Sequence, residues 1–168
     1  MDQTTTDAIE VDGAAAAADD EEVRRRREGI NDLLSGTFNT ILRVEERSLD
    51  NRVTQGLTIN EVHTLVAVGL HESNPMNVVA SRLGVTLATL TACVNRLVNK
   101  GFVERTRDEQ DRRRVLLTLT KQGRAVVRVH DNFHRRMIDE ALADLTEEEE
   151  RVLASALLKV QAFFEAEA

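Results

Sequence analysis

Three consecutive arginines, Arg112 to Arg114, stand in the charged stretch RDEQDRRRVLLTLTKQG (107–123). A guanidinium is planar and permanently charged, so it can bind a phosphate or enter a narrow groove of a nucleic acid. Asp111 and Arg113 are two positions apart, and in an extended chain their side chains point to the same side. We therefore expect the Asp111 carboxylate to hydrogen-bond Arg113 and to pre-set its guanidinium for the minor groove of DNA.

Basic residues gather in the middle of a chain whose net charge is −7. Residues 76–136 hold 13 Lys and Arg against 5 Asp and Glu, while the rest of the chain holds 9 against 24. A basic region between acidic ends is the electrostatic pattern of a DNA-binding protein. Besides Arg113, the arginines expected to approach DNA, mostly through phosphates, are Arg82, Arg105, Arg107, Arg112 and Arg114. The alternative is a solvated hairpin with internal salt bridges.

The elements that must position these arginines begin upstream, in SNPMNVVASRLGVTLATLTACVNRLVNKG (73–101). Pro75 suits the start of a first helix, and Gly84 supplies the positive φ that a tight turn between helices needs. Thr86 is a good N-cap for a second helix, which Gly101 ends. This spacing predicts a helix-turn-helix, although a helical hairpin in an ordinary bundle gives a similar pattern.

The second helix of this motif has one apolar side and one side of short polar residues. Leu90, Val94 and Leu97 are expected to face the core. Threonine methyl groups fit thymine methyls and asparagine fits adenine, so the outer side can read bases in the major groove. The residues expected there are Thr86, Thr89, Thr91 and Asn95, with Thr86 and Thr89 near the phosphates at the helix N-terminus.

Two strands follow this helix directly. FVERTR (102–107) is rich in β-favouring residues, and VLLTLT (115–120) alternates apolar side chains on its two sides. The arginine stretch forms the turn between them. A helix-turn-helix followed at once by a hairpin is a winged helix, so the fold class is mainly α with a small β-hairpin, and the arginines lie on the wing.

Helical patterns flank the winged helix on both sides. One runs from Ile30 to about Arg47, and TINE (58–61) is a capping box that opens a short helix. Downstream, Thr120 and Thr146 are N-caps of two further helices. The domains expected are a disordered acidic tail (1–22), an N-terminal dimerisation helix and connection (23–57), the winged helix-turn-helix (58–120) and C-terminal dimerisation helices (121–168). Apolar stripes at both ends of the chain indicate a homodimer held by its termini.

The composition and the motifs limit which classes of protein this sequence can belong to. No apolar run reaches the ~18–20 residues of a membrane span, and the first residues lack the features of a signal peptide. The single cysteine, Cys93, fits a reducing cytoplasm and is expected to be buried. We find no Gly-rich phosphate loop and no nucleophile elbow, so the sequence does not indicate an enzyme.

The segment LGVTLATLTACVNRLVNKGFVERTRDEQDRRRVLLTLTKQGRAVV (83–127) resembles the MarR family of bacterial regulators. Its Lys-Gly, Phe-Val-Glu-Arg, Asp-x-x-Asp-Arg-Arg and Leu-Thr-x-x-Gly elements carry the resemblance, which covers residues 30–164. The resemblance implies a dimeric winged helix-turn-helix repressor that binds near-palindromic double-stranded DNA and is controlled by a ligand near its dimer interface.

Three shorter pieces, EVHTL (61–65), VTLATLT (85–91) and VHDNFHRRM (129–137), resemble the FabT-like repressors of fatty-acid synthesis genes. That likeness implies long-chain acyl-acyl carrier protein as co-repressor, with its chain in an apolar channel of the dimer. The acidic tail and the Pro75-Met76 pair depart from the likeness.

Histidines offer a second kind of ligand chemistry. His130 and His134 are four apart on one side of a helix, and this spacing can chelate zinc. A third ligand would have to come from His63, Glu45 or Glu46. The alternative is that the pair lines the dimer interface or a channel for an aromatic or acyl ligand. The candidate ligand-binding residues are therefore His63, His130, Phe133 and His134.

Overall fold

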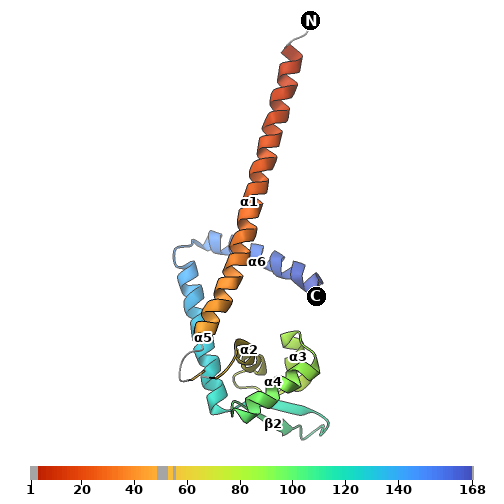
Figure 1. The fold of residues 1–168 in the computed structure, drawn as a ribbon, viewed down its shortest axis with the longest axis vertical. Coiled ribbons are helices and arrows are strands. Elements are labelled where there is room, and N and C mark those ends of the chain that lie inside the picture. The colour runs from red at the N-terminus through yellow and green to blue at the C-terminus, as the bar shows by residue number, and fades with distance from the viewer. Residues whose placement is uncertain (1–3, 49–52, 55, 168) are drawn as a thin grey trace. The chain divides into compact units, whose positions relative to one another are not determined.

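The computed structural model describes residues 4–48, 53–54 and 56–167 (Figure 1). The chain divides into two compact units, Met1–Gln55 and Gly56–Ala168, and each is described by itself.

The N-terminal unit contains one long helix, α1 (Thr4–Ser48). We expected a disordered tail over residues 1–22, and this prediction is wrong for residues 4–22, which are helical. Two features of the sequence account for the helix. Ala14–Ala18 is a run of the residue with the highest helix propensity, and Arg24 and Arg25 pair with Glu21 one turn away at 2.6 and 3.1 Å.

The C-terminal unit holds the remaining elements in the expected order. They are α2 (Ile59–Val68), β1 (Asn74–Pro75), α3 (Met76–Leu83), α4 (Leu87–Asn99), β2 (Val103–Arg107), β3 (Val115–Leu119), α5 (Lys121–Leu142) and α6 (Glu147–Glu167). Figure 1 shows α2, α3, α4 and the hairpin gathered around the start of α5, with α6 following its far end. This is the winged helix predicted from the sequence.

The sheet has three antiparallel strands in the order β1-β3-β2. In the hairpin, Val103 pairs with Leu119 and Arg107 with Val115. The short strand β1, in which Asn74 pairs with Leu117, was not predicted. Pro75 was expected to start a helix, and it is indeed the N-cap residue of α3 as well as part of β1.

The capping residues predicted from the sequence lie at the ends of helices in the structure. Thr58 and Glu61 form the predicted capping box of α2. Gly84 is left-handed with φ 62°, as the turn between α3 and α4 requires, and the Thr86 hydroxyl accepts the backbone N–H of Thr89. Thr120 caps α5 in the same way, through the N–H of Gly123.

The core lies where α2, α4, the start of α5 and the sheet meet. Leu90, Val94 and Leu97 of α4 are buried, as predicted, and so is Cys93. Their neighbours in the buried core include Val62, Leu65, Val79, Leu117, Leu119 and Val126. These contacts fix α4 by its inner side and leave its outer side exposed.

A buried carboxylate joins α2 to the end of α4. Glu61 is 1% exposed, and its oxygens accept from Lys100 Nζ at 2.7 Å and from Arg96 Nε at 3.3 Å. The backbone N–H of Thr58 donates to the same carboxylate at 3.0 Å. Burial by itself raises the pKa of Glu61, but the hydrogen bonds from Lys100, Thr58 and Arg96 together with the charge of Lys100 outweigh it and lower the pKa overall.

We predict that Glu61→Gln destabilises the protein by about 1–2 kcal/mol at neutral pH, because a neutral amide loses the charge-assisted bonds to Lys100 and Arg96. The folded pKa lies below the unfolded value, so the contribution of Glu61 is present above the unfolded pKa and is lost as the pH falls through the folded pKa. Urea unfolding of both proteins at neutral and acidic pH measures this. A difference that does not narrow in acid would contradict the prediction, and Glu104→Gln on the exposed side of β2 is the control.

Candidate DNA-binding surface

Helix α4 presents a row of short side chains to solvent. Thr86, Ala88, Thr89, Ala92 and Asn95 are exposed, as expected for the outer side of a recognition helix. The hydroxyls of Thr86 and Thr89 lie 2.9 Å apart at the N-terminus of the helix. This end of the helix also carries the positive end of the helix dipole, which favours a phosphate.

Thr91 differs from the other threonines of this surface. It is half-buried, and its hydroxyl donates to the backbone carbonyl of Leu87 at 2.7 Å. With the hydroxyl so engaged, the methyl group is the part of Thr91 best suited to contact a base.

The tip of the wing is held by two aspartates. Asp108 accepts the N–H of Gln110 at 2.9 Å, and Asp111 accepts the N–H of Arg113 at 3.0 Å. Backbone bonds from Asp108 to Arg114 (3.1 Å) and from Arg114 to Asp111 (2.9 Å) close the turn. The tip is therefore an ordered loop that presents Arg112 and Arg113, both exposed, to solvent.

The role predicted for Asp111 is corrected in one respect. We expected its carboxylate to bond the side chain of Arg113, whereas the bond in the structure goes to the backbone N–H of Arg113. An aspartate side chain is short and readily bonds a backbone N–H two residues on, forming a turn of its own. Asp111 thus fixes the loop from which the guanidinium projects. Asp108 accepts the backbone N–H of Gln110 in the same way, and it was not singled out from the sequence.

The other arginines differ in how they are held. Arg107 is exposed. Arg105 Nη2 approaches the carbonyl of Thr91 at 3.4 Å, and Arg114 lies 3.8 Å from Asp108. Arg82 donates to the carbonyl of Ala67 at 3.0 Å and lies 3.6 Å from Glu72. The guanidinium of Arg82 therefore already contacts Ala67 and Glu72 of the same chain. A phosphate contact by Arg82, as predicted, would add to these two interactions.

The recognition helix and the wing open on one hollow of about 400 Å³. Leu87 and Thr91 come from α4, while Arg105, Arg113 and Arg114 come from the hairpin; Pro75, Met76, Asn77 and Val115 complete its lining. Thr91 of the helix and three arginines of the hairpin thus lie on the same side of this unit. A duplex placed against that side would meet the helix and the wing together.

Comparison with known proteins agrees with this geometry. Residues 57–115 match the family model of the MarR family. The chain is 30% identical over 132 residues to the HTH-type transcriptional regulator YhjH of Bacillus subtilis, covering 74% of this chain and 73% of that protein. The chain belongs to the MarR family. The matched segment contains the helix-turn-helix and the arginine-rich tip of the wing.

Solved MarR-type structures resemble this chain over most of its length. Streptococcus pneumoniae FabT in complex with DNA is 37% identical, with a TM-score of 0.78, and the match covers 84% of this chain and 99% of that one. The Staphylococcus aureus MepR–DNA complex is 26% identical with a TM-score of 0.61, covering 76% and 96%. This MarR-family protein is accordingly a DNA-binding transcriptional regulator and not an enzyme. The individual DNA contacts stay predictions.

Over the described residues of this MarR-family chain, each helix taken singly is too short or too polar to cross a membrane. Within the described ranges, α3 and α4 taken together reach the necessary length and composition, and the pair bends by 107°.

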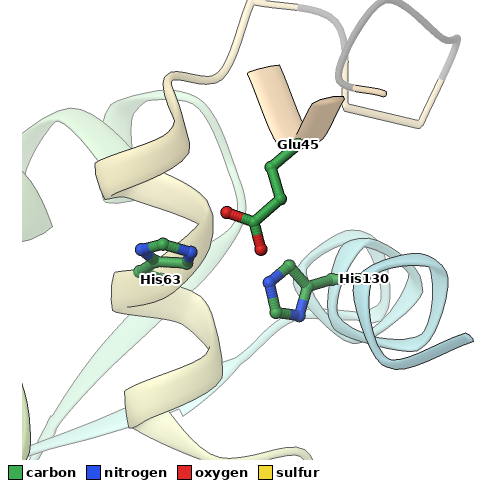
Figure 2. A group of neighbouring side chains, drawn as sticks. All are labelled: Glu45, His63 and His130. Atoms are coloured by element: carbon green, nitrogen blue, oxygen red, sulfur yellow. The ribbon is translucent and has the colours of Figure 1, made fainter. Parts of the chain in front are cut away.

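The structure brings the predicted ligand-binding residues of the C-terminal unit together. His130 Nε2 and His134 Nε2 lie 3.1 Å apart on α5, and the ring of Phe133 lies 5.3 Å from that of His134. His63 on α2 faces His130, with 5.6 Å between ring centroids (Figure 2). Glu45 and Glu46 belong to the N-terminal unit. The ligand role of these four ring residues stays a prediction.

Proposed function

We propose that this MarR-family protein is a cytoplasmic repressor that binds near-palindromic operators as a homodimer. Helix α4 enters the major groove through Thr86, Thr89, Thr91 and Asn95, and Arg113 enters the minor groove. The observation that carries the proposal is the hollow shared by α4 and the wing, since it puts Thr91 of the reading helix and the cations Arg105, Arg113 and Arg114 on one side.

The dimer is supported by the apolar residues of α6. Among the described residues of this helix none is buried, and several large apolar side chains are exposed: Val152, Leu153, Leu157, Leu158, Phe163 and Phe164. An apolar surface of this extent is costly in water, and a second copy of the same helix would cover it. Helix α1, taken by itself, also exposes large apolar side chains, among them Leu33 and Phe38.

Genome-wide mapping of bound DNA tests the repressor proposal. We expect a small number of sites with an inverted repeat, located over promoters whose transcription rises when the gene for this protein is deleted. Binding without sequence preference, or transcription that is unaffected by the deletion, would refute the proposal. The neighbouring genes would identify the regulated pathway.

For the regulated pathway we propose fatty-acid synthesis, with long-chain acyl-acyl carrier protein as the co-repressor. The support is the 37% identity to FabT and the resemblance of the segments around His63 and His130 to FabT-like repressors. We predict that acyl carrier protein loaded with a long acyl chain raises operator affinity at least about tenfold, a coupling of about 1.4 kcal/mol. Titration with unloaded carrier protein is the control, and equal effects of the two forms would contradict the prediction.

A second candidate effector is a transition-metal ion. The observation that favours it is the meeting of three histidines from two helices, because imidazole is a preferred ligand of zinc.

A further inference from the structure

We propose that Glu61 is a positioning residue for DNA recognition. Through Lys100 and Arg96 it fixes the rotation and tilt of α4, and it thereby sets how strongly the protein prefers its operator over other DNA. Glu61 acts through α4 and does not itself contact DNA. The inference rests on the proposed function, in which α4 reads the operator.

The carboxylate of Glu61 holds the last turn of α4 from one side. Arg96 and Lys100 are four residues apart, so they lie on the same side of the helix. Lys100 Nζ donates to Oε2 of Glu61 at 2.7 Å, and Arg96 Nε donates to Oε1 at 3.3 Å. Lys100 Nζ also donates to the carbonyl of Gly56 at 2.6 Å, which ties the end of α4 to the segment before α2.

Glu61 is itself held in place on α2. It is 1% exposed, and the backbone N–H of Thr58 donates to its Oε2 at 3.0 Å. Burial raises the pKa of Glu61, but the hydrogen bonds from Lys100, Thr58 and Arg96 lower it overall, so the carboxylate is ionised at neutral pH. Both bonds to α4 are therefore charge-assisted, and such bonds are stronger than bonds between neutral groups.

Apolar packing alone does not fix the orientation of α4 in this way. Leu90, Val94 and Leu97 hold the helix against the core, but the hydrophobic effect is not directional. Hydrogen bonds are directional, so two of them on one side of the helix restrict its rotation about its own axis.

A small change at the C-terminal end of α4 is large at its reading end. The helix has 13 residues and is therefore about 20 Å long, so a tilt of a few degrees about its C-terminal end moves its N-terminus by about 1 Å. Thr86 and Thr89 lie at that end. A displacement of this size breaks hydrogen bonds to base edges, whereas the contacts of long cationic side chains with phosphates can adjust.

The negative charge of Glu61 and its positioning role affect DNA binding in opposite directions. DNA is a polyanion, so removal of a nearby carboxylate should by charge alone strengthen binding to every sequence. Arg96 and Lys100 would remain, with side chains that are 58% and 35% exposed. Loss of positioning should instead weaken binding to the operator alone. The two effects can therefore be separated by their sign.

The test compares Glu61→Gln with the wild-type full-length protein on the mapped operator and on scrambled DNA. We expect operator affinity to fall about fivefold or more, which is the lower end of the loss of one base contact. Affinity for scrambled DNA should stay the same or rise. Glu104→Gln makes the same charge change on the exposed side of β2 and should keep the wild-type preference. Operator affinity in Glu61→Gln that equals or exceeds that of the wild type would overturn the positioning role.

A general loss of stability is controlled by Val127→Ala. Val127 is buried in α5, so its truncation leaves a cavity and destabilises the protein without touching the link between α2 and α4. At a temperature at which circular dichroism shows both variants folded, Val127→Ala should prefer the operator as the wild type does. An equal loss of preference in Val127→Ala would show that stability, and not the link, sets it.

Arg96→Gln and Lys100→Gln give a readout that does not require a Glu61 variant to fold. Each removes a cation and weakens binding to all DNA, so the ratio of operator to scrambled affinity is the quantity to compare. We expect both variants to lower this ratio. Glu61→Gln combined with Lys100→Gln should lower it no further than the more severe single variant, since both changes break one link. Wild-type ratios in the single variants, or losses that add in the double variant, would overturn the inference.

Failure of this inference and failure of the proposed function are distinguishable. A wild-type protein without preference for any DNA sequence would refute the proposed function. A wild type that prefers its operator, with a Glu61→Gln variant that keeps this preference, would refute the positioning role alone.

Discussion

Replacing Gly123 by alanine is expected to destabilise the protein by about 3 kcal/mol, as steric overlap in a packed core does. A Cβ at this position would overlap the backbone carbonyl oxygen of Phe102 and would lie 3.3 Å from Leu119. The Phe102 carbonyl is not free to move, because it accepts the N–H of Thr120 at 3.0 Å. Gly123 is itself part of the N-cap of α5, through its N–H bond to the Thr120 hydroxyl at 3.2 Å.

The overlap lies where α4, the wing and α5 meet. We therefore expect Gly123→Ala to weaken DNA binding as well, even though Gly123 is buried and does not reach the surface. Urea unfolding measures the stability. In the control Gly36→Ala the new Cβ meets nothing within 4 Å, and the helix propensity of alanine should leave stability unchanged or raise it by up to about 1 kcal/mol. A Gly123→Ala protein as stable as the wild type would show that the junction can relax.

Arg113→Ala is expected to weaken operator binding by roughly 1–3 kcal/mol, since a guanidinium in the minor groove makes contacts that alanine cannot replace. Arg113 is exposed on an ordered tip and lines the hollow shared with α4. The loss should be larger for operators with a narrow minor groove beside the reading helix than for unrelated DNA.

Variants at two neighbouring positions, Arg112 and Asp111, separate the roles of the wing residues. Arg112→Ala should weaken binding to all sequences alike and lower the salt dependence by about one counterion, as expected for a phosphate contact. Asp111→Asn keeps an acceptor for the N–H of Arg113 and should cost less than Asp111→Ala. Fluorescence anisotropy with operator and scrambled DNA measures all of these. Unchanged affinity in Arg113→Ala would exclude its minor-groove role.

Local signals in the sequence were sufficient for most of the fold. The N-caps at Thr58, Thr86 and Thr120 and the left-handed Gly84 depend on residues within one turn, and the structure confirms each of them. Strand β1 was not predicted because two residues are too few to show the alternation of apolar and polar side chains that marks a strand. Asn74 is a strand residue only because it pairs with Leu117, which is distant in the sequence. Residues 4–22 were assigned to a tail because they cannot bury a core, yet alanines and charge pairs favour a helix without one.

The residue types of the candidate DNA-binding surface could be predicted from the sequence, but its hydrogen bonds could not. Short polar side chains on α4 and cations on the hairpin were predicted from spacing. The hydrogen-bond partner predicted for Asp111 was wrong. A spacing of two residues allows the carboxylate to bond either the side chain or the backbone N–H of Arg113, and the two donors compete. The convergence of His63 with His130 is a tertiary contact, so the sequence named the residues without placing them.

The salt dependence of operator affinity tests the central claim, that α4 and the wing bind DNA as one surface, most directly. For six to ten phosphate contacts, affinity should fall about 10³–10⁵-fold between 50 and 200 mM salt. In the double variant Arg112→Ala/Arg113→Ala both the affinity and the slope should be reduced. An operator affinity that does not respond to salt, or a slope that the double variant leaves unchanged, would contradict the account.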